Sequence, residues 1–122
     1  MHKFDLKNRT AIITGGAQGF GLDIAKRFLD SGATAIIWDI DENELIKASK
    51  ELNNPKLSYN VVDVSNFNEV KETVDEITEF LNIDILINNA GITGSTASLW
   101  DYDVDEWNKI IYLLTDSKSM KR

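Results

Sequence analysis

Glycines are concentrated in residues 14–21, where the sequence reads Thr-Gly-Gly-Ala-Gln-Gly-Phe-Gly between an apolar run and an amphipathic run. At a strand-to-helix junction, Gly15 allows a sharp turn, Gly19 lets a pyrophosphate approach the backbone, and Gly21 lets the helix pack closely on the sheet. Free N–H groups and a partial positive charge at the start of the helix attract phosphates. A tight turn without a ligand is the alternative. The pattern favours dinucleotide binding, at a site that includes Gly15, Gln18, Gly19, Phe20 and Gly21.

A carboxylate ends the second apolar run at Asp39, 18 residues after Gly21. A carboxylate at this place can accept hydrogen bonds from the adenosine ribose hydroxyls, and it repels the 2′-phosphate of NADP. Where that phosphate would need a cation, the glycine segment offers Gln18. A helix N-cap role is the alternative for Asp39, but Asp41 is better placed for that role. We therefore predict NAD(H) as the cofactor and include Asp39 and Ile40 in its site.

Asp63 and Val64 follow the third apolar run. In a dinucleotide-binding sheet this strand end lies beside the adenine pocket. Asp63 can accept a hydrogen bond from the adenine amino group, or it can support the start of the following helix. Both interpretations stay open, and we include Asp63 and Val64 in the predicted site.

The elements that would position these residues alternate along the chain. Continuous apolar runs at 10–14, 34–38, 57–62 and 83–88 predict parallel strands covered on both faces. Apolar residues spaced by three and four predict helices between them, and a further helix after Asp103. Right-handed crossovers turn this order into a doubly wound parallel sheet. We predict an α/β, Rossmann-type fold with strand order 3-2-1-4.

The segments described above, followed by Asn88-Asn89-Ala90-Gly91, together resemble the short-chain dehydrogenase/reductase family. The motifs TGxxxGxG and NNAG both occur, at the separation usual in that family. The resemblance runs from about Phe4 to Ile111 and covers about half of a typical member, so it implies a truncated Rossmann fold. It implies NAD-linked alcohol–carbonyl interconversion in the parent enzymes. It also implies that Asn88 and Asn89 tie the central strands together, and that Asn89, Ala90 and Gly91 line the adenosine side of the cofactor.

Catalytic residues are missing from the resemblance. The family's catalytic serine and its Tyr-x-x-x-Lys pair would lie farther on, and we assign no catalytic residue. The tyrosines of this chain are followed four residues later by acids, where the mechanism needs a cation. We predict an NAD-binding domain over 1–112, a divergent tail over 113–122, and no activity of the chain alone. The alternatives are a non-enzymatic nucleotide-binding or regulatory module, or one chain of a complemented two-chain oxidoreductase.

Composition excludes other classes of function. The net charge of −7 argues against nucleic-acid and anionic-membrane partners. Without cysteine, and with His2 as the single histidine, we predict no metal site. Because there is no long apolar segment and no secretory signal, we expect a cytoplasmic protein.

In the complete family fold the strand at 83–88 is an interior one, so we expect self-association or a complementing chain at its exposed edge.

Overall fold

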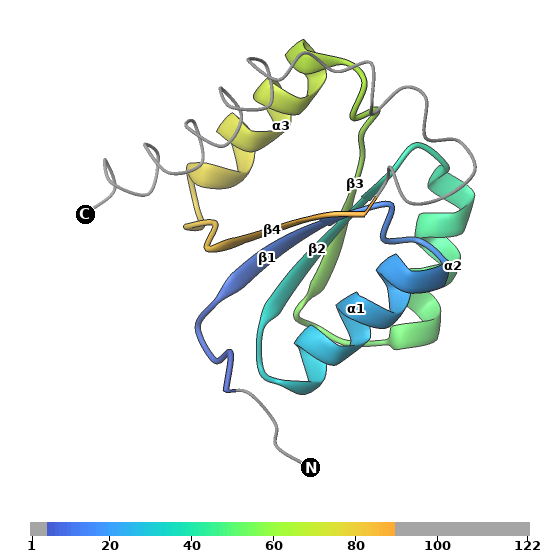
Figure 1. Cartoon of the computed structure of the whole chain (residues 1–122), viewed down its shortest axis with the longest axis vertical. Helices are drawn as coiled ribbons and strands as arrows, with labels where there is room; N and C mark the ends of the chain where they lie inside the picture. Colours follow the sequence, from blue (N-terminus) through green and yellow to red (C-terminus); the bar gives the residue numbers. More distant parts are fainter. Residues whose placement is uncertain (1–4, 90–122) are drawn as a thin grey trace.

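Strands and helices alternate along the chain. The computed structural model describes residues 5–89, which form four strands and three helices (Figure 1). The strands are β1 (Thr10–Thr14), β2 (Thr34–Asp39), β3 (Leu57–Val61) and β4 (Ile85–Asn88). The helices are α1 (Gly19–Asp30), α2 (Glu42–Leu52) and α3 (Phe67–Thr78). The predictions for Ala90 and Gly91, for a helix after Asp103 and for the tail 113–122 lie outside the described residues.

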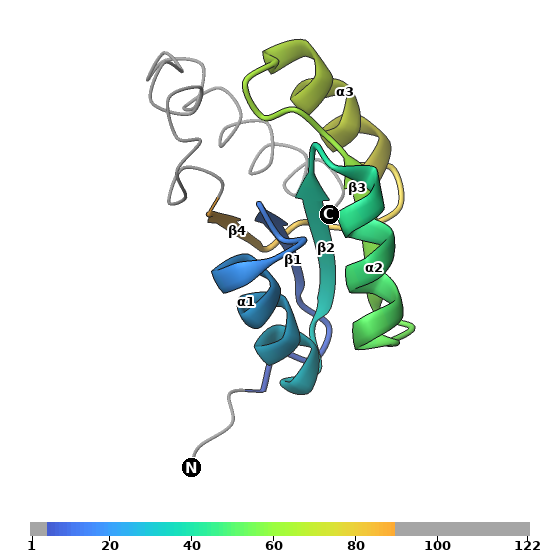
Figure 2. The same ribbon diagram turned by 90° about the vertical axis from the view of Figure 1, so that its right-hand side faces the viewer.

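One parallel sheet holds these strands in the order β3-β2-β1-β4. The predicted order 3-2-1-4 and the Rossmann-type α/β fold are therefore confirmed. Figure 2 shows β4 on one side of β1 and β2 on the other. In this register Thr14 lies beside both Trp38 and Asn88, so β1, β2 and β4 end at the same edge of the sheet. Asp39 is paired with Val61 at the end of β3, which brings the third strand to this edge as well.

Apolar cores cover both faces of the sheet, because successive side chains of a strand point to opposite faces. Helices α1 and α2 pack on one face, where Ile13 and Ile37 are buried. Helix α3 packs on the other face, where Ile12 and Trp38 are buried (Figure 1). Coverage on both sides explains why the central residues of β1 and β2 are continuously apolar rather than alternating.

Residue types that favour helix caps stand at the start of α2 and after the ends of α1 and α2. The side chain of Asp41 accepts a hydrogen bond from the Glu44 backbone N–H and begins α2, as predicted. Helix α1 ends at Ser31, and Gly32 follows with φ of +94°. Pro55 lies two residues after Asn53, the left-handed residue that ends α2.

Some local details differ from the sequence pattern. Asn66 caps α3 through the Glu69 backbone N–H, but the Glu69 carboxylate accepts from the Asp63 N–H at 3.0 Å instead of completing a capping box. Strand β4 begins at Ile85 rather than at residue 83. The preceding Asp84 uses its carboxylate to accept from the Thr10 N–H at 3.0 Å and to pair with Arg9 at 3.6 Å, which fixes the amino ends of β1 and β4 together.

Candidate functional site

The glycine segment forms the turn between β1 and α1, and two of its residues have backbone conformations that favour glycine. Gly15 has φ of +62° and Gly19 has φ of +61°, in the left-handed region. A Cβ added to Gly19 would have no neighbour within 4 Å, so the space in front of this residue is open. The turn therefore has the shape predicted for it, and its backbone is accessible to a ligand.

The first turn of α1 lacks the side-chain cap that the other two described helices have. Gln18 occupies the N-cap position with extended backbone, and its side chain makes no capping hydrogen bond. By contrast, Asp41 and Asn66 each accept a backbone N–H at the start of α2 and α3. The N–H groups at the start of a helix have no partner within the helix. Those of α1 are therefore available to an anion, with the exposed Phe20 side chain beside them.

Gly21 brings α1 against the end of the sheet. A Cβ on this residue would lie 2.1 Å from the Gly15 carbonyl oxygen and 2.7 Å from Nδ2 of Asn89. No side chain larger than hydrogen fits between the helix and these groups. The close packing predicted for Gly21 is therefore present, and Asn89 lies at the same junction.

Asp39 lies beside the glycine segment. Its Oδ2 accepts a hydrogen bond from the Ala17 N–H at 3.4 Å, and its Oδ1 accepts from the Ile40 N–H at 2.9 Å. Because Asp41 caps α2, the alternative N-cap role for Asp39 is excluded. The Ile40 side chain is 69% exposed directly after this carboxylate. A ribose recognised by Asp39 would thus be adjacent to phosphates held by the start of α1.

Asp63 and Val64 lie in the turn between β3 and α3. The Asp63 carboxylate accepts from the Ser65 N–H at 2.9 Å, and the Asp63 N–H donates to Glu69. This geometry fits the helix-supporting interpretation, and the adenine role of Asp63 stays a prediction. The Val62 N–H donates to the Asp39 carbonyl oxygen at 3.0 Å, so this turn starts next to Asp39.

A hydrogen-bond network that sequence reasoning missed is centred on Thr14, which is 1% exposed. Its Oγ1 donates to Asn88 Oδ1 at 3.1 Å and accepts from the Asn89 N–H at 2.9 Å. The Asn89 side chain then donates from Nδ2 to the Gly15 carbonyl oxygen at 3.1 Å. The network joins the ends of β1 and β4 and fixes the first residue of the turn. The link between β1 and β4 that the resemblance implies for Asn88 and Asn89 is therefore present, and both asparagines form it through hydrogen bonds with Thr14.

Gly16 is a second residue whose role was missed. Its N–H donates to the Trp38 carbonyl oxygen at 3.1 Å, and a Cβ would approach the Ile37 side chain to 2.6 Å. Thr14 and Gly16, the two residues whose roles were missed, both stand within the glycine pattern of residues 14–21, so the sequence does mark their positions. Their contacts are with strands distant in sequence, and the local spacing of glycines does not reveal them.

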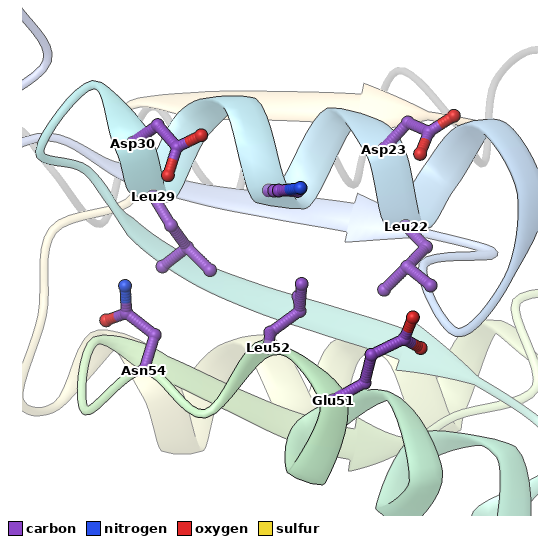
Figure 3. A pocket seen from close by; sticks show the side chains of 8 residues that line it. Leu22, Asp23, Leu29, Asp30, Glu51, Leu52 and Asn54 are labelled. Atoms are coloured by element: carbon purple, nitrogen blue, oxygen red, sulfur yellow. The ribbon is translucent and has the colours of Figure 1, made fainter.

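A cavity of about 250 Å³ lies elsewhere, between α1 and α2 (Figure 3). None of the predicted site residues lines it. Its walls combine leucines with Asp23, Asp30, Glu51, Asn54 and Lys26, and the excess of carboxylates is unfavourable for a pyrophosphate. The carboxyl ends of the strands are where open α/β sheets bind ligands, and we place the candidate site there.

Two features are absent from residues 5–89. No group of three or more His, Cys, Asp or Glu side chains within that range is arranged to hold a metal ion. In the same part of the chain no helix combines the length and apolar character needed to cross a bilayer. The groups that the candidate site itself offers are backbone N–H groups and the Asp39 carboxylate.

Comparison with known proteins gives consistent matches. The family model described as short chain dehydrogenase matches residues 9–117. A 3beta-hydroxysteroid dehydrogenase 2 of Eggerthella lenta is 38% identical over an alignment of 113 residues, and the match covers 90% of this chain and 44% of that protein. A 3-oxoacyl-[acyl-carrier-protein] reductase of Chlamydia muridarum is 38% identical over 87% of this chain and 44% of its own length. The crystal structure of L-sorbose reductase from Gluconobacter frateurii, complexed with NADPH and L-sorbose, matches with a TM-score of 0.81 and 25% identity over 98% of this chain and 51% of that one. The chain thus spans about half the length of its relatives.

Proposed function

The chain belongs to the short chain dehydrogenase family, and from that premise we propose that it binds NAD(H) at the carboxyl ends of its strands. Members of this family bind nicotinamide cofactors. The pyrophosphate would be held by N–H groups of residues 15–21 at the start of α1. Asp39 would accept the adenosine ribose hydroxyls, and Ile40, Asp63 and Val64 would surround the adenine.

One observation carries the proposal: the Asp39 carboxylate lies within 3.4 Å of the Ala17 N–H, beside a helix start that no side chain caps. A dinucleotide needs an anion site and a ribose acceptor a few ångströms apart, and the described residues supply both. The open space at Gly19 fits the same ligand, because a phosphate can reach the backbone there without meeting a side chain.

The preference for NAD(H) over NADP(H) follows from charge. Asp39, Asp41 and Glu42 follow one another closely at the end of β2, and residues 14–21 contain no lysine or arginine. A 2′-phosphate would bring negative charge to these carboxylates without a cation to offset it. The sorbose reductase structure contains NADPH, so a preference of this chain for NAD(H) has to come from the local charge.

The proposed role is the cofactor-binding part of an oxidoreductase that interconverts alcohols and carbonyls. NAD(H) supplies or accepts the hydride when bound, and the protein must hold and protonate the substrate. We assign no catalytic residue to this chain, and Asn89, Ala90 and Gly91 are proposed to line the adenosine side of the cofactor. We also propose a cytoplasmic location for the protein.

Calorimetric titration with NAD⁺ and NADP⁺ tests this function, with Asp39→Asn as the variant. The amide keeps an acceptor for the Ile40 N–H but removes the charge, so we expect weaker NAD⁺ binding and a loss of discrimination against NADP⁺ of about tenfold, or about 1.4 kcal/mol. Glu51→Gln removes one negative charge from the exposed end of α2, away from the proposed site, and should preserve the preference. Identical cofactor selectivity in the wild-type chain and Asp39→Asn would contradict the ribose assignment.

A further inference from the structure

The cavity between α1 and α2 has an apolar lining. Leu22, Leu29 and Leu52 point into the space between the two helices (Figure 3). Leu29 is buried, whereas Leu22 and Leu52 are half-buried, so part of their apolar surface faces the cavity. The volume of about 250 Å³ lies below the roughly 300–1,000 Å³ that is typical of pockets for drug-sized ligands. A ligand that fits this cavity is therefore small and partly apolar.

Carboxylates stand at both ends of this apolar lining. Figure 3 shows Asp23 and Glu51 on the side of Leu22, and Asp30 on the side of Leu29. Asp23 and Asp30 lie about two turns apart on α1, which corresponds to about 10 Å along the helix axis. The three acidic side chains are exposed, and none of them forms an ion pair with another described residue. The cavity thus offers two separate places for a cation, joined by apolar surface.

The ends of the two helices add negative charge to the cavity. Helix α1 ends at Asp30 and α2 ends at Leu52, and both residues line the cavity. The carbonyl groups at the end of a helix carry a partial negative charge, which stabilises nearby cations. A cation of the chain already uses such a position, because the Lys56 ammonium donates to the Gly32 carbonyl oxygen at 3.2 Å, two residues after α1. The cavity therefore favours a positively charged ligand.

Lys26 is the cation that lines the cavity itself. It stands between Asp23 and Asp30 on α1, and its side chain is exposed. Three carboxylates against one ammonium group leave an excess of negative charge. The lysine stem is flexible, so the ammonium group can turn toward solvent when a ligand takes its place.

We propose that the cavity between α1 and α2 binds a linear aliphatic polyamine, with its methylene groups on the three leucines and its ammonium groups at the carboxylates of both ends. A small inorganic cation would meet the carboxylates but leave the leucines in water, and a neutral alkyl chain would do the reverse. The proposal does not depend on NAD(H) binding, because no residue of the proposed cofactor site lines this cavity.

An NMR titration of the ¹⁵N-labelled 122-residue chain with spermidine, at constant ionic strength, tests the proposal. The backbone N–H signals of residues 22–30 and 51–54 should shift together and saturate. Magnesium chloride supplies charge without an alkyl chain, and octanediol supplies the chain without charge. We expect each of them to bind at least about tenfold more weakly than spermidine. Equal affinity for Mg²⁺, shifts centred on the exposed carboxylates of α3, or no saturable shift would overturn the proposal.

Paired variants separate this site from general attraction to an acidic chain. The double variant Asp30→Asn with Glu51→Gln removes one carboxylate from each end and should weaken spermidine binding by roughly fivefold. Glu72→Gln with Glu76→Gln removes the same charge from exposed positions of α3 and should change it by less than about twofold. Equal effects of the two double variants would contradict the assignment of the ligand to the cavity.

A change of opposite sign is expected at the lysine of the cavity. Lys26→Met replaces the ammonium group by an uncharged side chain of similar length, so spermidine should bind about twofold or more tightly. Lys71→Met, on the exposed face of α3, is the control and should have a smaller effect. Weaker binding by Lys26→Met would overturn the proposal. NAD⁺ binding is measured separately on the same variants and should not change, so the proposed function and this site can fail independently.

Discussion

Gly21→Ala gives the most demanding prediction about how α1 is positioned. The new Cβ would lie 2.1 Å from the Gly15 carbonyl oxygen, a backbone atom that cannot rotate away. The two groups must separate by about 1 Å, and overpacking of this kind costs about 1–3 kcal/mol. Gly21 does not have a positive φ, and alanine favours helix by about 1 kcal/mol. Any loss of stability would therefore come from the steric contact rather than from the backbone conformation.

The same displacement should affect ligand binding. The N–H groups at the start of α1 move with the helix, so we expect NAD⁺ affinity to fall by at least about tenfold. Chemical denaturation measures the free energy of unfolding, and calorimetry measures affinity at a temperature where the variant is folded. Asp23→Ala, on the exposed side of the same helix, is the control and should change neither quantity by much. A Gly21→Ala variant as stable as the wild type, with the same affinity, would refute the packing described for this junction.

Three further variants probe other parts of the structure. Gly19→Ala places a Cβ in open space at φ of +61°, so we expect a stability loss of about 1–2 kcal/mol in denaturation and weaker NAD⁺ binding in calorimetry. In the wild type the buried Asn89 N–H donates to Thr14 Oγ1 at 2.9 Å, and Thr14→Val leaves this N–H without an acceptor. The free energy of unfolding of the variant should therefore fall by about 1–3 kcal/mol in denaturation, and Thr14→Ser should recover most of the loss. Asp84→Ala removes the acceptor of the Thr10 N–H at the amino end of the sheet and should lower stability in thermal melts without changing NAD⁺ affinity, since the proposed site lies at the opposite end.

Features that depend on local pattern were predictable from the sequence. The apolar runs located all four strands to within two residues at either end, and the alternation of strand and helix fixed their order in the sheet. Asp39 was predicted to lie beside the glycine turn because the end of β2 is adjacent to the end of β1 in that order. The positive φ of Gly15 and Gly19 follows from the same turn.

Features that depend on contacts between distant segments could not be predicted in this way. Thr14 meets Asn88 and Asn89 only because β1 and β4 are paired, and its hydroxyl carries no periodic signal. Gly16 is required by the side chain of Ile37 on a neighbouring strand. Glu69 stands at the spacing of a capping box, but the turn before α3 brings the Asp63 N–H within its reach instead. In each case the chain has to fold before the partner is defined.

The most direct test of the account is an NMR titration of the ¹⁵N-labelled chain with NAD⁺. Binding should perturb the backbone N–H signals of residues 15–21, Asp39 and Ile40 together, because the phosphates and the ribose would contact both segments at once. The signals of residues at the amino ends of the strands, such as Thr10, should stay in place. A folded chain with no perturbed signals, or with changes confined to the cavity between α1 and α2, would contradict the account.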